Sequence, residues 1–122
     1  MIVMNKRIQI YIFTIFISSC TFAEKVSSVC ISDSTVFNDI LSCYLADYKK
    51  NDKILNSLYQ KKISKLSKEN KEKLRNSQRE WVKKKENTCV ADENEYGRES
   101  HFEAIECQTE MTKERISFLK KY

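Results

Sequence analysis

Residues 77–89 have the sequence SQREWVKKKENTC, which contains the only tryptophan of the chain and ends on a cysteine. In this stretch and just before it, side chains three to four residues apart fall on one face of a helix. They are Leu74, Gln78, Trp81, Lys85 and the pair Thr88 and Cys89. A face that combines an indole with an amide needs partners that cover the ring and satisfy the polar groups. The stretch therefore predicts a helix that packs against other helices through a partly polar face.

The first 23 residues have the features of a bacterial secretory signal. Lys6 and Arg7 precede an apolar run over residues 8–17, and small residues follow up to Ala23. The run is too short for a membrane-spanning anchor helix. Cleavage after Ala23 would release residues 24–122 as a soluble periplasmic or secreted protein. The alternative is that ISSC, residues 17–20, acts as a loose lipobox, so that an acylated Cys20 anchors the protein as a lipoprotein.

Four cysteines follow the signal, at Cys30, Cys43, Cys89 and Cys107. An even number of cysteines in an exported chain predicts two disulfides. A zinc site is disfavoured because no two of these cysteines form a CxxC pair and His101 is the only histidine.

The disulfide pairing has three open solutions. Counting residues from the expected helical turn places Cys43 opposite Cys89, which leaves Cys30 to reach Cys107, and we prefer this pairing. Cys43 and Cys107 also lie off the main apolar seams of their helices, which allows Cys43–Cys107 with Cys30–Cys89 as the alternative.

The helical pattern begins after three good N-cap residues, Asp33, Ser34 and Thr35. Apolar positions then repeat in steps of four and three, as in helices that pack side by side, and predict one helix over residues 35–66. Ser67 is the expected N-cap of a second helix that ends near residue 87 or 89.

Gly97, the only glycine, lies in the loop expected over residues 92–100. Positions between Phe102 and Leu119 again repeat in steps of three and four and predict the third helix. The sequence therefore predicts an all-α fold, a small disulfide-linked bundle of three helices in one domain.

Residues 52–59, DKILNSLY, place polar groups on a face expected to point inward. A carboxylate there is costly unless it is paired or hydrogen-bonded. A helical hairpin that turns near Leu66 would put this stretch level with Trp81, and the third helix would add a guanidinium. We therefore expect a buried polar cluster with a structural role. Its members are Asp52, Asn56, Gln78, Trp81 and Arg115.

Several of these motifs, taken in order, resemble one known family. They are the signal, cysteines around the first helix start, D-x-x-L-N-x-x-Y, Q-x-x-W followed by a cysteine, and Cys107 with Thr112 and Arg115 downstream. This chain is similar to the lysozyme inhibitor LprI-like N-terminal domain family over residues 24–122. It departs at residues 83–86, KKKE, where relatives commonly carry an arginine–aspartate pair. The resemblance implies the fold and the disulfides, and inhibition of lysozyme as a hypothesis, since that activity is attached to one branch.

Charge is segregated along the chain, whose formal net charge is +5. Four exposed-looking acids of the third helix form a candidate partner surface, here called the acidic stripe. They are Glu99, Glu103, Glu106 and Glu110. Lysozymes are usually strongly basic, so the stripe could steer a lysozyme or related muramidase onto the protein. The simpler interpretation is a solvated face whose ion pairs contribute little.

The alternative function is binding to the cell envelope. Lysines crowd the tip of the first hairpin, residues 61–73, which could contact anionic lipid or wall polymer. Catalysis is not expected, because His101 beside Ser100 lacks the orienting acid of a triad. The chain also shows no phosphate or calcium loop, so we expect no metal and no cofactor. An exported protein rarely meets nucleic acid, so we expect no nucleic acid partner either.

Overall fold

The computed structural model describes residues 30–122, and the expected signal peptide with Cys20 lies outside these residues. Three long helices make up the fold: α1 (Phe37–Ile63), α2 (Lys68–Thr88) and α4 (Ser100–Lys121). A single-turn helix, α3 (Glu93–Tyr96), lies in the connection between α2 and α4. The prediction of an all-α bundle with three helices and two disulfides is confirmed.

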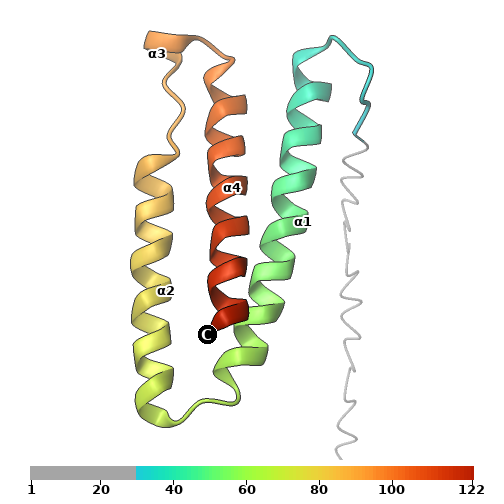
Figure 1. Ribbon diagram of the computed structural model, residues 1–122. Coiled ribbons are helices and arrows are strands. Elements are labelled where there is room, and N and C mark those ends of the chain that lie inside the picture. The colour runs from blue at the N-terminus through green and yellow to red at the C-terminus, as the bar shows by residue number, and fades with distance from the viewer. Residues whose placement is uncertain (1–29) are drawn as a thin grey trace, which may run out of the picture.

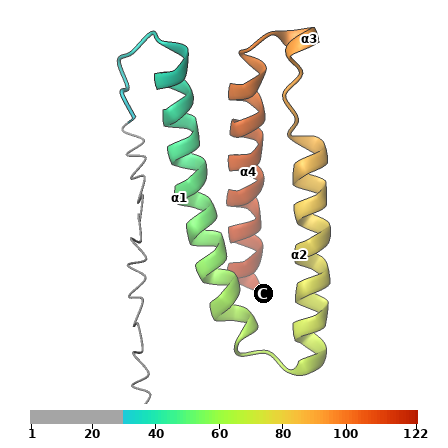
Figure 2. The same cartoon turned by 180° about the vertical axis from the view of Figure 1, so that it is seen from behind.

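The helices are arranged with α4 between α1 and α2 in both Figure 1 and Figure 2. Close backbone approaches concentrate between α1 and α4, whereas α2 approaches α4 closely at few positions. The turn between α1 and α2, residues 64–67, defines what we call the hairpin end of the bundle. The opposite end carries α3 and both disulfides, and we call it the disulfide end (Figure 1).

Both ends of α1 differ from the expected limits. The N-cap is Val36, which has no side-chain cap, rather than one of residues 33–35. The Ser34 hydroxyl instead donates to the Asp39 carboxylate at 2.6 Å and accepts from the Val36 amide at 3.1 Å. The helix stops at Ile63, because the chain turns there into α2. Ser67 caps α2 as predicted, by accepting a hydrogen bond from the Asn70 amide.

The connection after α2 is more ordered than the expected loop. Asp92 caps α3 by accepting hydrogen bonds from the amides of Asn94 and Glu95, at 3.0 and 3.2 Å. Gly97 then takes φ 70° and ψ −170°. Only glycine adopts this region readily, so Gly97 allows the chain to enter α4.

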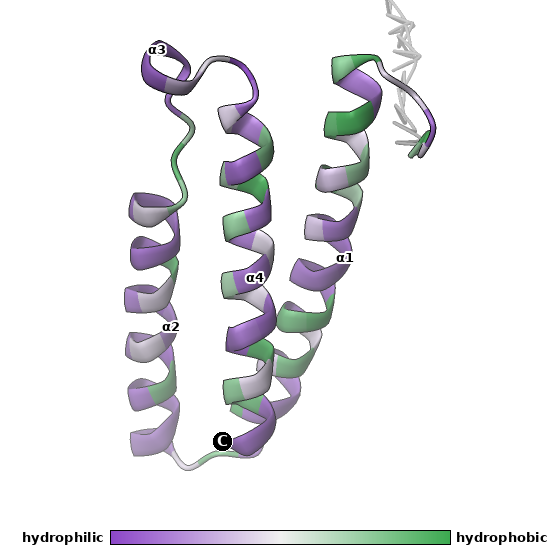
Figure 3. Cartoon of the chain, turned by 45° about the horizontal axis from the view of Figure 1, so that its top comes forward, coloured by the Kyte–Doolittle hydropathy of each residue, from purple (hydrophilic) through white to green (hydrophobic). Residues whose placement is uncertain are grey.

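The apolar core is short and lies towards the hairpin end. Its buried members are Leu55, Leu74, Ile116 and Leu119, and half-buried apolar side chains, Trp81 among them, pack around them. Figure 3 shows α2 hydrophilic along most of its length, with the hydrophobic colour concentrated on α1 and α4. Within residues 30–122, no helix is long and apolar enough to cross a membrane.

The disulfide end has aromatic contacts in place of a buried aliphatic core. The ring centroids of Phe37 and Phe102 are 4.8 Å apart, and those of Tyr44 and Phe102 are 5.3 Å apart. The Arg98 guanidinium lies 4.3 Å from the centre of the Phe37 ring. These contacts join the first turns of α1 to the first turns of α4.

Both disulfide pairings that we considered are wrong. Cys30 is bonded to Cys43, and Cys89 to Cys107, with Cα–Cα distances of 4.5 and 5.5 Å. The counting argument assumed that α1 and α2 face each other directly. Because α4 lies between them, the cysteine at the end of α2 meets α4, and the residues before α1 fold back onto α1.

Candidate functional site

The middle of the bundle holds a buried arginine. Arg115 of α4 is 8% exposed. Its Nε donates to Oε1 of Gln78 and its Nη2 donates to Oγ of Ser77, both at 2.9 Å. The guanidinium also lies 4.3 Å from the centre of the Phe118 ring. Burial lowers the pKa of Arg115 from its ordinary value, and the two hydrogen bonds to α2 compensate part of the lost hydration.

A second buried cation, Lys85 of α2, is 7% exposed. Its ammonium donates to the Tyr48 hydroxyl at 2.7 Å and lies 5.1 Å from the centre of the Trp81 ring. We call Lys85, Arg115 and their hydrogen-bond partners the polar layer. Among residues 30–122, no ion pair involves Lys85 or Arg115. Aromatic faces and neutral oxygens therefore hold both charges, and their long side chains link α2 to its neighbours.

The expected five-residue polar cluster is wrong in its α1 half. Asn56 donates to the Asp52 carboxylate at 2.9 Å within α1, with Asn56 exposed and Asp52 half-buried. Neither bonds to Gln78 or Arg115. The reason is distance: α1 and α2 approach each other too little for a short carboxylate to reach across, whereas lysine and arginine side chains can.

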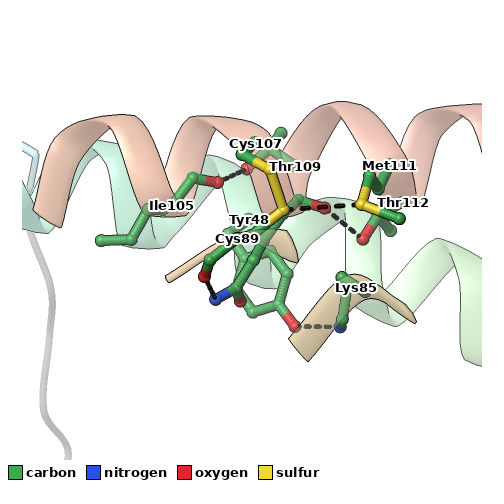
Figure 4. The surroundings of a disulfide bond; sticks show 9 residues. Tyr48, Lys85, Cys89, Ile105, Cys107, Thr109, Met111 and Thr112 are labelled. Atoms are coloured by element: carbon green, nitrogen blue, oxygen red, sulfur yellow. Dashed lines mark hydrogen bonds between the residues drawn. A yellow bond between two sulfur atoms is a disulfide. The ribbon is translucent and has the colours of Figure 1, made fainter. Parts of the chain in front are cut away.

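The Cys89–Cys107 disulfide closes the polar layer towards the disulfide end (Figure 4). Sδ of Met111 lies 3.5 Å from Sγ of Cys89. The buried hydroxyls of Thr109 and Thr112 donate within α4, to the carbonyls of residues 105 and 108, at 2.8 and 2.7 Å. These threonines need no partner from another helix, so α4 can occupy the centre of the bundle.

The acidic stripe is exposed at all four of its positions. Glu110 accepts a hydrogen bond from Lys113 at 2.8 Å, and Lys113 also lies 3.8 Å from Asp47. The Glu110 hydrogen bond is the main cause of the raised pKa of Lys113. The charge of Glu110 is therefore locally neutralised. The other three glutamates of the acidic stripe form the stronger negative surface.

The α3 connection extends this negative surface and adds apolar area. Tyr96 and Val90 are 61% and 65% exposed. The neighbouring Glu95 carboxylate is the main cause of the raised pKa of Tyr96, and partial desolvation and Glu103 make smaller contributions. A pocket of about 220 Å³ lies between Tyr96, Val90, Glu103 and the disulfide.

The imidazole of the one histidine contacts a carboxylate, and the hydroxyl of the preceding serine bonds elsewhere. His101 Nε2 contacts the Glu93 carboxylate on α3, at an exposed position. The Ser100 hydroxyl is buried and donates to the Gly97 carbonyl at 2.7 Å. Within residues 30–122, no group of three or more potential metal-ligating side chains comes together.

Sequence reasoning missed the Lys85–Tyr48 bond and the role of Ser77. A signal for the first was present, because Lys85 lies four residues after Trp81 and seven after Gln78 on the same helix face. A lysine at such a position has either to be buried or to extend past the ring to water. Here the Tyr48 hydroxyl makes burial acceptable.

Of the comparisons with known proteins, the one with family models found a match. The model of the family described as lysozyme inhibitor LprI matches residues 30–119. These limits run from the first disulfide cysteine to the last buried core residue. No curated protein and no solved structure matches the sequence. The chain therefore belongs to the LprI family of lysozyme inhibitors.

Proposed function

We propose that the protein is an exported lysozyme inhibitor that acts by binding a lysozyme or related muramidase non-covalently. The observation that carries the proposal is the family match, which spans the whole helical bundle. Two features support it. The chain has a secretory-type N-terminus, and its domain is cross-linked by two disulfides, as is usual for small proteins that work outside the cytoplasm.

The binding surface in this proposal is the acidic stripe together with α3. Glu99, Glu103 and Glu106 supply negative charge that would attract a basic enzyme and speed its association. Tyr96 and Val90 supply exposed apolar area beside this charge. Interfaces commonly combine such features, since an aromatic side chain contributes contact energy while charges fix the orientation.

Covalent and hydrogen-bond contacts restrain the same surface in the free protein. The Cys89–Cys107 disulfide fixes the end of α2 to α4, and Asp92 caps α3. Gln108 also donates to the Cys89 carbonyl at 3.4 Å. A surface that is ordered in the free protein loses less conformational entropy on binding, which favours tight association.

The decisive experiment measures lysis of bacterial cell walls by a panel of lysozymes in the presence of oxidised residues 24–122. We expect inhibition that rises with the amount of protein and that is lost when the disulfides are reduced. An absence of inhibition of every lysozyme at large molar excess would refute the proposal.

Charge reversal then tests the surface. The double variant Glu103→Lys with Glu106→Lys should slow association with an inhibited lysozyme by about tenfold or more at low salt and by less at high salt, because salt screens exposed charges. The matched control is Glu69→Lys with Glu80→Lys on α2, where both acids are also exposed. Equal association rates for the two double variants would remove the acidic stripe from the binding surface.

A further inference from the structure

A groove of about 640 Å³ runs between α1 and α2, in the half of the bundle nearer the hairpin end. We call it the basic groove. Its lining contains three amides and three cations and no carboxylate. These side chains are Asn56, Gln60, Gln78, Arg75, Arg79 and Lys83. The groove lies between α1 and α2, away from the acidic stripe beside α3, and the proposed inhibition does not use it. It shares only Gln78 with the hydrogen bonds of Arg115.

Two of the amides are held in opposite orientations by their neighbours. Arg115 donates to the amide oxygen of Gln78, so Gln78 can offer its NH₂ group to a ligand. Asn56 donates its own NH₂ group to Asp52, so it can offer its oxygen. A ligand in the groove therefore meets a donor and an acceptor at fixed positions, which is the pattern that adjacent sugar hydroxyls can match.

The cations of the groove are available to a ligand. Arg75 and Lys83 pair with Glu72 and Glu80 of their own helix at exposed positions, where such pairs are weak and exchange readily. Among residues 30–122, Arg79 forms no ion pair, and its side chain donates one hydrogen bond, to the Asn76 amide oxygen at 3.5 Å. A guanidinium in this state can bind a carboxylate through two parallel hydrogen bonds.

The groove continues along α1. A second hollow of about 510 Å³ shares Asn56 and Gln60 with it and is also lined by Tyr48, Lys49, Lys53, Ser57 and one carboxylate, Asp52, which accepts the hydrogen bond from Asn56. Tyrosine rings line both parts, Tyr59 in the first and Tyr48 in the second. An extended ligand of several units fits such a path better than a compact ion does. Aromatic rings beside amides are suited to the apolar faces and the hydroxyls of sugars.

From this combination we infer that the basic groove binds an anionic glycan, a sugar chain that carries carboxylate groups. The amides and rings would bind the sugar units, and Arg79 with its neighbouring cations would bind the carboxylates. An anionic lipid surface is a poorer match. Membrane-surface binding needs apolar side chains that project towards the lipid, whereas the apolar side chains of the groove, Tyr59 and Val82, are half-buried.

Four probes separate the contributions of sugar and charge, with oxidised residues 24–122 and calorimetry as the readout. They are polygalacturonate, a carboxylated glycan; dextran, a neutral glycan; polyglutamate, a carboxylated chain without sugar; and vesicles of phosphatidylglycerol. We expect polygalacturonate to bind, and dextran and polyglutamate to bind about tenfold more weakly or not at all, since each lacks one class of contact worth about 1.4 kcal/mol or more.

Variants then locate the site. Arg75→Gln with Arg79→Gln should weaken polygalacturonate binding by about tenfold or more, because both guanidinium–carboxylate contacts are lost. Lys65→Gln with Lys68→Gln removes the same charge from the exposed hairpin tip and should change the affinity by less than about twofold. Gln60→Ala should weaken polygalacturonate binding and leave any residual polyglutamate binding unchanged.

Each other outcome overturns the inference. Equal losses from the two double variants would indicate diffuse charge attraction. Polyglutamate that binds as tightly as polygalacturonate would show that no sugar is recognised. Binding to vesicles alone would indicate that the basic groove contacts the membrane. Binding to none of the probes would show that the basic groove is not a glycan site. Wall-lysis inhibition in the same variants keeps this test separate from that of the proposed function.

Discussion

The hairpin end and the disulfide end of the bundle are stabilised in different ways. At the hairpin end, Leu55, Leu74 and Leu119 are almost completely buried and contact one another through all three long helices. At the disulfide end, the residues that join the helices are a disulfide, a cluster of aromatic rings and buried polar groups. Between the two ends, Lys85 and Arg115 fill the layer that a longer aliphatic core would occupy.

This difference shows how a small domain extends a short core. The 21 residues of α2 span about 30 Å, but its only buried apolar side chain is Leu74, besides Cys89 at its C-cap. Hydrophobic burial alone cannot hold such a hydrophilic helix along its length. Long cationic side chains and a covalent bond therefore hold the remainder of α2, and the surface proposed for partner binding is at the covalently held end.

The largest expected effect comes from the hairpin end. Leu119→Ala should lower the free energy of unfolding by about 3–4 kcal/mol, because Leu119 is fully buried and its removal leaves a cavity. Urea denaturation of the oxidised protein, followed by circular dichroism, measures this loss. Ile54→Ala is the control, since Ile54 is exposed and should change stability by less than about 0.5 kcal/mol. Similar losses in the two variants would contradict the assignment of the core.

Removal of the Cys89–Cys107 bond should have the next largest effect. Cys89→Ser with Cys107→Ser should cost about 3 kcal/mol, since the bond closes a loop between residues 18 apart. Cys30→Ser with Cys43→Ser opens a loop of similar size but frees only the segment before α1, so its cost should be smaller. Urea denaturation of both variants compares them, and a larger loss for the second pair would reverse our view of the disulfide end.

Arg115→Ala tests the layer between the two ends. The variant loses two hydrogen bonds to α2 and the packing against Phe118, so we expect a loss of about 2 kcal/mol. Fluorescence of Trp81, whose ring centre lies 5.9 Å from the guanidinium, should shift in the same variant. Unchanged fluorescence and unchanged stability together would show that α2 is held by other contacts.

Gly97→Ala should have the smallest effect on stability, about 1–2 kcal/mol, because alanine does not readily adopt the backbone angles of Gly97. A Cβ at this position would also lie 3.2 Å from the Glu99 carboxylate. Hydrogen exchange should show faster opening of the α3 connection, with residues of the hairpin end unchanged. Uniformly faster exchange in both ends would mean that the two ends do not open independently.

Most of the local structure could be predicted from the sequence, because its signals are local, and the exceptions are the ends of α1 and the turn α3. The Ser67 cap, the helical periods and the glycine at the last chain reversal each depend on a few neighbouring residues. The position of α4 between α1 and α2 could not be predicted, because an apolar seam does not specify which of two neighbours it packs on. The errors in disulfide pairing and in the Asp52 cluster both follow from that single missing fact.

The candidate site was predictable where it depends on the spacing within one helix, and not where it depends on how the helices pack. The acidic stripe is a property of one helix and was found from its spacing, and Arg115 and Gln78 were named because both had to be satisfied. Their bond is present, whereas the partner expected from α1 is not. The α3 connection was missed although its signals are local, since Asp92 caps the turn and Gly97 ends it. The basic groove depends on how α1 and α2 pair in space, so it was not visible in the spacing.

The order of the disulfides has a consequence for how the chain would mature under the proposed export. Each bond joins cysteines that are consecutive in the sequence after Cys20, 13 and 18 residues apart. When a chain crosses a membrane from its N-terminus, Cys30 and Cys43 emerge together, well before Cys89. Oxidation in order of emergence therefore produces the native pairs directly. Under the proposed export, we therefore expect the native pairs to form in a compartment that supplies an oxidant without an isomerase.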